Sequence, residues 1–310
     1  MTGSPLSTQR LGALALAILV VLASKNHTFA QEGCDELYRP TRCASLFGSS
    51  RCSCGTLFQW SPSASCQGGP NLDAPLVTDR PDFTEASSTV GRGVAQLEIG
   101  YTFTHDNDST TDTRSHSFPE PLLRYGILED WLELRLGWNY ADETTNGLNL
   151  NGSEDLYLGF KIGLTPQEGI LPEMALIPQM TVPSGASAFT ANEVLPGVNL
   201  IYGWEVNEFL STAGSTQFNR AIDDGSGRTY TEWAQSWTVA YSLSEEWGAY
   251  TEWFAFFPDS ADTARTEHYF NGGFTYLLSD DIQWDIRAGK GLNGPADDYF
   301  VGTGLSLRFK

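Results

Sequence analysis

Segments of about ten residues in which apolar and polar side chains alternate recur along most of the chain. The clearest runs from Trp131 to Tyr140: its even-numbered positions are Leu, Trp or Tyr, and the odd-numbered positions between them are Glu133, Arg135, Gly137 and Asn139. Side chains of a β-strand point alternately to its two faces, so this pattern predicts strands with one apolar and one polar face. We expect twelve of them, near residues 95–104, 118–127, 131–140, 155–164, 173–182, 197–206, 209–219, 231–243, 247–257, 267–278, 282–290 and 298–309.

The connections between these segments alternate in length. Five are short, such as Leu128-Glu129-Asp130-Trp131 and Ser279-Asp280-Asp281-Ile282. Six are longer polar loops, near residues 105–117, 141–154, 183–196, 220–230, 258–266 and 291–297. Outer-membrane barrels have short periplasmic turns and longer outer loops. The chain is therefore predicted to be all-β, a transmembrane antiparallel up-and-down β-barrel of about 12 strands whose two ends return to the periplasmic side.

A soluble β-sandwich is the alternative fold for a chain of alternating strands. Its core would be about as apolar, but its outward face should be charged and its turns less regular in length. In this chain nearly every segment has one face of Leu, Ile, Val and aromatic residues, and another of small residues and scattered charges of both signs. The alternating loop lengths and the even number of strands favour the barrel.

The first 30 residues have the layout of a secretory signal peptide. Arg10 precedes an apolar run from Leu11 to Ala23, and Thr28-Phe29-Ala30 supplies small residues at positions −3 and −1 before Gln31. The apolar run is too short for a helix that spans a bilayer. We therefore expect a signal peptide at residues 1–30, export of the chain, and localisation in the bacterial outer membrane.

All five cysteines lie between this leader and the first predicted strand, at Cys34, Cys43, Cys52, Cys54 and Cys66. Residues 31–77 are otherwise rich in Ser, Gly and Pro without a sustained period, so we expect a loosely structured periplasmic extension and linker before a barrel of residues 78–310. Export permits disulfides, and an odd number leaves at least one thiol free or paired with another molecule. Attachment to a partner is one alternative. A zinc site is a weaker one, because one residue is a short spacing between Cys52 and Cys54.

The chain has a formal net charge of −20. No basic patch could outweigh this charge, which argues against nucleic acid as a partner. The partners that we expect are outer-membrane lipid, the barrel-assembly machinery and a small-molecule solute.

A more specific pattern begins at residue 78. The run Thr78-Asp79-Arg80-Pro81-Asp82-Phe83-Thr84-Glu85 is followed by Gly93-x-x-Gln96-Leu97-Glu98-x-Gly100-Tyr101. In this pattern, residues 78–310 resemble the outer-membrane β-barrel transporters of the "meta-pathway of phenol degradation" type. The resemblance implies a barrel and the passage of small molecules, including aromatic or apolar ones. Lys310 is a departure, because barrels of this kind commonly end on the aromatic residue, here Phe309.

Charged residues on the polar faces of the predicted strands are candidates for lining the lumen. They are Glu98, Arg124, Glu133, Arg135, Lys161, Glu205, Glu252, Asp285, Arg287 and Arg308. Both signs occur, so neighbours can pair across strands, whereas an isolated charge in a narrow lumen would be costly. Twelve strands lie between the filled eight-stranded barrel and the open sixteen-stranded porin. We therefore expect a narrow lumen, with a permanently filled polar core as the alternative.

Asp79, Arg80, Asp82 and Glu85 precede the first predicted strand and are candidates for a periplasmic gate. Pro81 restrains the backbone and prevents a helix there. We predict that this run folds into the periplasmic mouth, with Arg80 paired to a carboxylate of the lumen, and that it narrows the pore.

Catalytic and metal-binding patterns are weak. The histidines outside the leader are His105, His116 and His268, and there is no Gly-x-Ser-x-Gly motif. Acidic residues of the first long loop, Asp106, Asp108 and Asp112, could hold calcium, but their spacing does not match an EF-hand and a solvated acidic loop is the simpler interpretation. We expect no catalytic residues, no metal and no cofactor.

We therefore expect passive passage of small molecules through a narrow, charged lumen. A structural or adhesive barrel that binds envelope partners is the first alternative. A barrel hydrolase that uses His268 as its base is the second, and no partner for that base can be placed from the sequence.

Overall fold

The structure, a computed structural model, describes residues 55–61 and 68–310. The predicted signal peptide at residues 1–30 and all five cysteines lie outside the described residues. Within those residues, no helix is long and apolar enough to cross a bilayer.

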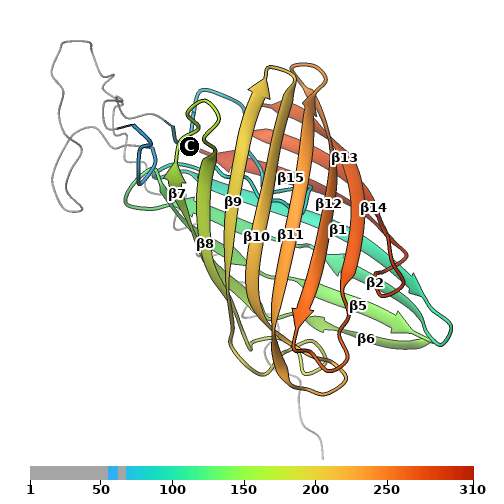
Figure 1. Cartoon of the computed structure of the whole chain (residues 1–310). Coiled ribbons are helices and arrows are strands. Elements are labelled where there is room, and N and C mark those ends of the chain that lie inside the picture. Colours follow the sequence, from blue (N-terminus) through green and yellow to red (C-terminus); the bar gives the residue numbers. More distant parts are fainter. Residues whose placement is uncertain (1–54, 62–67) are drawn as a thin grey trace, which may run out of the picture. The chain divides into compact units, whose positions relative to one another are not determined.

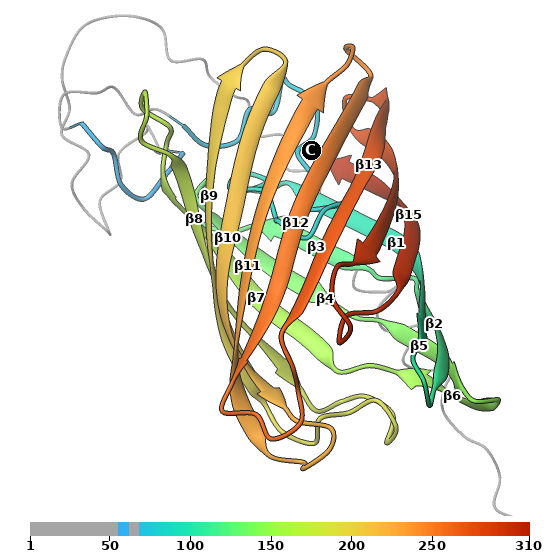
Figure 2. The ribbon, with the colours of Figure 1, turned by 45° about the vertical axis from the view of Figure 1, so that its right-hand side comes forward.

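The described chain forms one antiparallel sheet of fifteen strands that closes on itself (Figures 1 and 2). The strands are β1 (Ala95–Asn107), β2 (Asp112–Phe118), β3 (Leu122–Gly126), β4 (Leu132–Gly137), β5 (Tyr140–Thr145), β6 (Leu148–Ser153), β7 (Leu156–Thr165), β8 (Glu173–Val182), β9 (Leu195–Asn207), β10 (Leu210–Ile222), β11 (Thr229–Ser242), β12 (Trp247–Asp259), β13 (Glu267–Ser279), β14 (Ile282–Gly291) and β15 (Tyr299–Phe309). Closure comes from β1 and β15, which pair from Ala95↔Phe309 to His105↔Tyr299.

Twelve strands span the barrel wall, and three of them are each interrupted once. In these three, β2 continues into β3, β4 into β5 and β6 into β7, which is why fifteen separate strands are seen. The prediction of a twelve-stranded antiparallel barrel is thereby confirmed. Its wall has a short-turn end, where the connection from β13 to β14 lies, and a long-loop end, where the connection from β14 to β15 lies.

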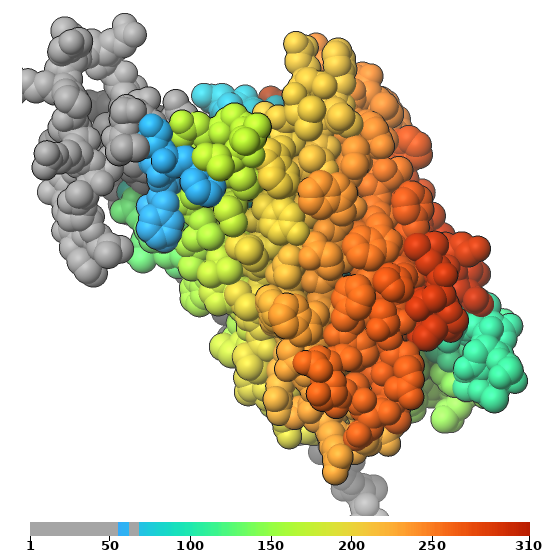
Figure 3. All heavy atoms as spheres, viewed as in Figure 1, coloured from blue at the N-terminus to red at the C-terminus, as the bar shows by residue number. Residues whose placement is uncertain are grey.

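In much of the wall, charged side chains point into the barrel and large apolar side chains point outward. In β4, Leu134 and Leu136 are 37% and 38% exposed, whereas Glu133 and Arg135 between them are almost completely buried. Figure 3 shows how the side chains of the later strands cover one face of the wall. This is the reverse of a soluble β-sandwich, because a bilayer solvates apolar side chains and excludes charges.

The interruptions lie side by side where prolines break the ladder. Pro119 and Pro121 separate β2 from β3 and cannot donate backbone hydrogen bonds. The carbonyl of Pro121 instead accepts a hydrogen bond from the amide of Trp138, between β4 and β5, at 3.1 Å. The carbonyl of Asn139 in turn accepts one from the amide of Glu154, between β6 and β7, at 3.0 Å. The predicted continuous strand from Trp131 to Tyr140 is therefore broken at Trp138 and Asn139.

Two of the predicted long loops are wrong. Most of residues 105–117 and 141–154 forms strands, because β1 continues to pair with β2 and β5 pairs with β6 beyond the interruptions. Threonine, which favours strands, recurs in both segments. The turn between β5 and β6 is Asn146-Gly147, with φ angles of 50° and 85°. Asn-Gly favours a tight hairpin turn of this kind, so the sequence itself indicated a hairpin at these residues.

Residues 74–90, here called the inner segment, run inside the barrel and form no part of its wall (Figure 2). The segment enters at the short-turn end, where the amide of Leu76 donates to the carbonyl of Asp280 at 2.7 Å. It leaves near β4, where the amide of Val90 donates to Glu133 Oε2 at 3.0 Å. The chain then begins the wall at Ala95.

Candidate functional site in the barrel interior

Asp79 of the inner segment is held by three cations of the wall. Lys161 Nζ of β7 lies 2.7 Å from Asp79 Oδ1, and Arg124 Nε of β3 lies 3.3 Å from Asp79 Oδ2. Arg135 of β4 forms the third ion pair. The strand register explains this convergence, because Arg124 pairs directly with Arg135 and Glu133 pairs directly with Lys161 across neighbouring strands. Three adjacent strands therefore present their inward charges at one height.

Carboxylates of the wall and of the inner segment complete this arrangement. Glu133 accepts from Arg124 Nε at 2.8 Å, and Glu98 accepts from Arg124 Nη1 at 3.1 Å. Glu85 pairs with Arg135. We call this set the ionic cluster: Asp79, Glu85, Glu98, Arg124, Glu133, Arg135 and Lys161. Its members satisfy one another, as buried charges require.

Arg80 binds the neighbouring part of the wall, where β14 and β15 close onto β1. Its guanidinium lies 2.8 Å from Glu120 Oε2 and 3.3 Å from Asp285 Oδ2, and it donates to the carbonyl of Thr303 at 3.2 Å. It rests on Gly100 and Gly304, which face each other across β1 and β15. A Cβ at Gly304 would lie 2.2 Å from Arg80 Nε, so only glycine leaves room for the guanidinium.

Backbone amides of the inner segment bind two carboxylates of the wall, Glu98 of the ionic cluster and Glu252. Glu98 accepts from the amides of Asp79 and Arg80, each at 3.0 Å. Glu252 of β12 accepts from the amides of Phe83 and Thr84, both at 2.7 Å. Charge-assisted hydrogen bonds therefore hold the inner segment in place, and these are about twice as strong as neutral ones.

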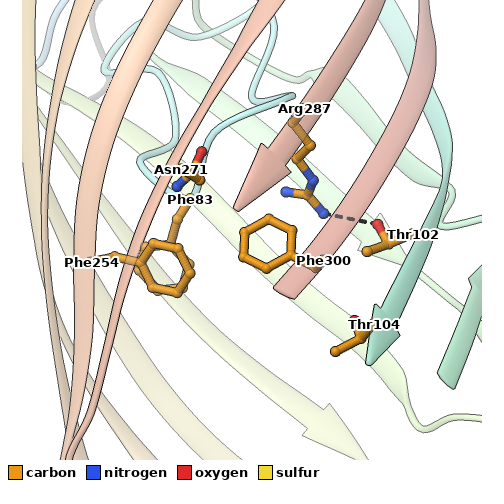
Figure 4. A pocket seen from close by; sticks show the side chains of 7 residues that line it. All are labelled: Phe83, Thr102, Thr104, Phe254, Asn271, Arg287 and Phe300. Carbon is orange, nitrogen blue, oxygen red and sulfur yellow. Dashed lines mark hydrogen bonds between the residues drawn. The ribbon is translucent and has the colours of Figure 1, made fainter. Parts of the chain in front are cut away.

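Two cavities adjoin the inner segment. The first, called the charged cavity, has a volume of about 290 Å³ and is lined by Asp79, Arg80, Pro81, Asp82, Phe83, Glu85, Glu98, Glu120, Leu122 and Arg287. The second, called the aromatic pocket, has a volume of about 210 Å³ and is lined by Phe83, Thr102, Thr104, Phe254, Asn271, Arg287 and Phe300 (Figure 4). Phe83 and Arg287 line both, so the two cavities meet at these side chains.

The four candidate gate residues all line the charged cavity. Of the ten candidate lumen residues, eight are buried in the interior: Glu98, Arg124, Glu133, Arg135, Lys161, Glu252, Asp285 and Arg308. Arg287 is half-buried and lines both cavities. Arg308 lies near the short-turn end, where its hydrogen bond to Asp281 at 2.7 Å lowers the pKa of that carboxyl.

The prediction that Glu205 lines the lumen is wrong. It occupies one of the alternate positions of β9 whose side chains face inward. However, it lies close to the short-turn end of that strand and is exposed, so it does not line the interior. Its backbone instead exchanges hydrogen bonds with the side chain of Gln167 in the neighbouring turn. Parity fixes the side of the sheet on which a residue lies, but not whether the wall still encloses it at that height.

Sequence reasoning missed the interior aromatic residues. We assigned aromatic side chains to the outer surface, yet Phe254 and Phe300 are buried beside Phe83 of the inner segment. The alternation of side chains along each strand could have identified both as inward-facing residues. Phe254 is two residues from the inward Glu252, and Phe300 shares the parity of Arg308.

The residues considered for catalysis or calcium binding have other contacts. His268 packs against Trp253 and Phe257, with ring centroids 5.9 Å and 5.7 Å apart. Asp108 accepts hydrogen bonds from the amides of Thr110 and Thr111 and so closes the turn after β1.

Comparisons with known proteins agree with this fold. The model of a family described as "Putative MetA-pathway of phenol degradation" matches residues 78–309. None of the curated proteins matches the chain. The COG4313 outer membrane channel from Pseudomonas putida F1 is a similar solved structure, with a TM-score of 0.59 and 14% identity over 74% of this chain and 99% of that chain. This identity supports a common fold alone.

Two other barrels are less similar. The KdgM porin in complex with disordered oligogalacturonate has a TM-score of 0.41 and 11% identity over 68% of this chain and 100% of that chain. The translocator domain of the autotransporter NalP from Neisseria meningitidis has a TM-score of 0.46 and 10% identity over 70% of this chain and 88% of that chain. Neither value supports an argument about function.

Proposed function

Because the chain belongs to the family described as "Putative MetA-pathway of phenol degradation", we propose that it is an outer-membrane channel for the passive passage of small molecules. The observation that carries this proposal is the pair of cavities inside the closed wall, which meet at Phe83 and Arg287. The similar Pseudomonas putida protein is described as an outer membrane channel, which supports the same interpretation. In this proposal the short-turn end faces the periplasm.

The inner segment is the gate in this proposal. Asp79, Arg80, Asp82 and Glu85 lie beside the charged cavity, and their polar contacts can be exchanged for contacts with water when the segment shifts. The charged cavity and the aromatic pocket follow one another along β1, from Glu98 to Thr104. A solute would pass the charged residues and the aromatic rings in succession. A narrow path of this composition suits small molecules with an apolar or aromatic part.

Single-channel recording in planar bilayers tests the gate. Arg80→Ala removes the contacts to Glu120 and Asp285, and we expect a severalfold higher conductance than for the unmodified protein. Arg92→Ala is the matched control: Arg92 lies outside the inner segment, is exposed, and binds Asp130 through its backbone amide, which the substitution keeps. Equal conductance in Arg80→Ala and Arg92→Ala would count heavily against a gate.

A reversible cross-link tests whether the inner segment must move. Thr84 Oγ1 lies 2.6 Å from Ser236 Oγ of β11, so cysteines at these positions are placed to form a disulfide. In a background with the five native cysteines replaced by serine, oxidation should abolish liposome swelling with small neutral solutes, and reduction should restore it. If neither this variant nor the unmodified protein swells liposomes, the barrel is structural and the channel proposal fails.

A further inference from the structure

The aromatic pocket has the size and surface of a site for one planar ring. Its volume is about 210 Å³, and a cavity of about 150 Å³ is already sufficient to hold benzene. Phe83 and Phe254 stack with their ring centroids 4.7 Å apart and an interplanar angle of 7°. Phe254 also stacks on Tyr269, at 4.8 Å. Figure 4 shows Phe300 next to this stack, with Arg287 on its other side.

Arg287 gives this apolar pocket a positive charge. Its Nη1 donates to the carbonyl of Pro81 at 2.8 Å, and its Nη2 donates to Thr102 Oγ1 at 3.0 Å. Its Cζ lies 5.5 Å from the centroid of the Phe300 ring. Its Nε is buried and has no hydrogen-bond partner among the described residues. The guanidinium is therefore bound by neutral oxygens only.

The other interior cations differ from Arg287 in this respect. Arg80, Arg124, Arg135, Lys161 and Arg308 each form an ion pair with a carboxylate, whereas Arg287 forms none with any residue that the structure describes. Asp285, two positions away on the same face of β14, is bound by Arg80. Arg287 is half-buried and lacks an ion pair within the described residues, which is costly, so an anion that enters this pocket gains an ion pair that these residues do not supply.

We propose that the aromatic pocket is a binding site for a one-ring aromatic carboxylate, with the ring against Phe300 and the edge of Phe254 and the carboxylate against Arg287. The proposal rests on the channel function for the route by which such a solute reaches the pocket. The aromatic lining favours an aromatic ring over an alkyl chain, and the guanidinium favours a carboxylate over a neutral group. Thr102 and Thr104 add hydroxyl groups to the same pocket.

Calorimetric titration of the full chain in detergent tests this site directly. The three probes are benzoate, the neutral and similarly shaped benzamide, and cyclohexanecarboxylate, which has the charge without a flat ring. We expect benzoate to bind about tenfold more tightly than either of the others. Benzamide lacks the charge, and charge-assisted hydrogen bonds are about twice as strong as neutral ones, whereas cyclohexanecarboxylate lacks the aromatic ring that packs against Phe300.

Variants separate the charge from the ring. Arg287→Gln keeps a donor toward Pro81 or Thr102 and should reduce the preference for benzoate over benzamide to about twofold or less, whereas Arg287→Lys should keep most of it. Phe300→Leu should weaken benzoate and benzamide alike. Lys290→Gln is the matched control on the same strand, because Lys290 is exposed, and it should bind all three probes as the unmodified protein does.

Equal affinities for benzoate and benzamide, or a preference that survives in Arg287→Gln, would overturn the proposal. Liposome swelling with small neutral solutes, measured on the same preparation, tests the channel separately. Swelling without selective benzoate binding removes this site and keeps the channel. Selective binding without swelling keeps the site and removes the channel.

Discussion

At the scale of single residues, the interior depends on the balance of charge around Asp79. Three cations, Arg124, Arg135 and Lys161, contact one carboxylate of the inner segment. Lys161 is fully buried, and its ammonium also donates to the carbonyl of Ala86 at 2.8 Å. Each of these charges is tolerated because its partners are in place, so the loss of one member affects the whole ionic cluster.

Lys161→Met tests this coupling. It removes a buried charge and leaves a comparable volume, and we expect a loss of about 3–5 kcal/mol in the free energy of unfolding, measured by denaturant titration in detergent micelles. The double variant Lys161→Met/Asp79→Asn restores the original charge balance of the cluster and should recover a substantial part of that loss. Purely additive effects of the two substitutions would show that they do not act through one cluster.

The inward residues were predictable at this scale, but their contacts were not. Parity alone identified Glu98, Glu133 and Lys161 as residues that point inward. It also included Glu205, which lies beyond the enclosed part of the wall. Parity could not identify Arg287 as the interior cation without an ion pair among the described residues, because that depends on which carboxylates the closed barrel brings near it.

At the scale of elements, the inner segment and the first strand form one unit. The Asp-Arg-Pro-Asp run contributes Asp79 and Arg80, and the Gln-Leu-Glu-x-Gly strand contributes Glu98 and Gly100. Glu98 accepts the amides of Asp79 and Arg80, and Gly100 leaves space for the guanidinium of Arg80. The two halves of the sequence pattern therefore contact each other. Gly304 of β15 pairs with Gly100, and together they form the seat, the space that the guanidinium of Arg80 fills.

Gly304→Ala tests the seat without altering any charge. The new Cβ would lie 2.2 Å from Arg80 Nε, so Arg80 must leave its position between Glu120 and Asp285. We expect a single-channel conductance close to that of Arg80→Ala and a loss of about 1–3 kcal/mol in unfolding free energy. Gly294→Ala is the matched control, because a Cβ there meets nothing within 4 Å. An unchanged conductance in Gly304→Ala would show that the seat does not restrict the pore.

At the scale of the whole molecule, carboxylates gather near the long-loop end of the barrel. Asp106 at the end of β1, Glu267 at the start of β13 and Asp297 in the loop before β15 interact electrostatically. Burial, reinforced by Asp106 and Glu267, raises the pKa of Asp297 to about 6. The barrel should therefore lose stability as pH rises from about 4, the pKa of Asp in the unfolded chain, to about 6, because Asp297 is ionised less readily in the folded state.

Asp297→Asn tests this pH dependence. Asparagine mimics the protonated carboxyl, so the variant should melt at a higher temperature than the unmodified protein at about pH 7.5, and this difference should shrink toward about pH 4. Both melting curves are measured in the same detergent, so that the other carboxylates titrate alike in the two proteins. A difference of the same size at both pH values would mean that the effect does not come from ionisation of Asp297.

The sequence by itself determined the barrel: the number of strands that span its wall and the face of each strand that turns inward. These features follow from local alternation and from turn composition, which neighbouring residues encode. The tertiary structure alone decided how the inner segment is seated and where the aromatic pocket forms. Those contacts join Arg80 to Asp285 and Phe83 to Phe254, residues far apart in the chain that meet only when β1 and β15 close the sheet.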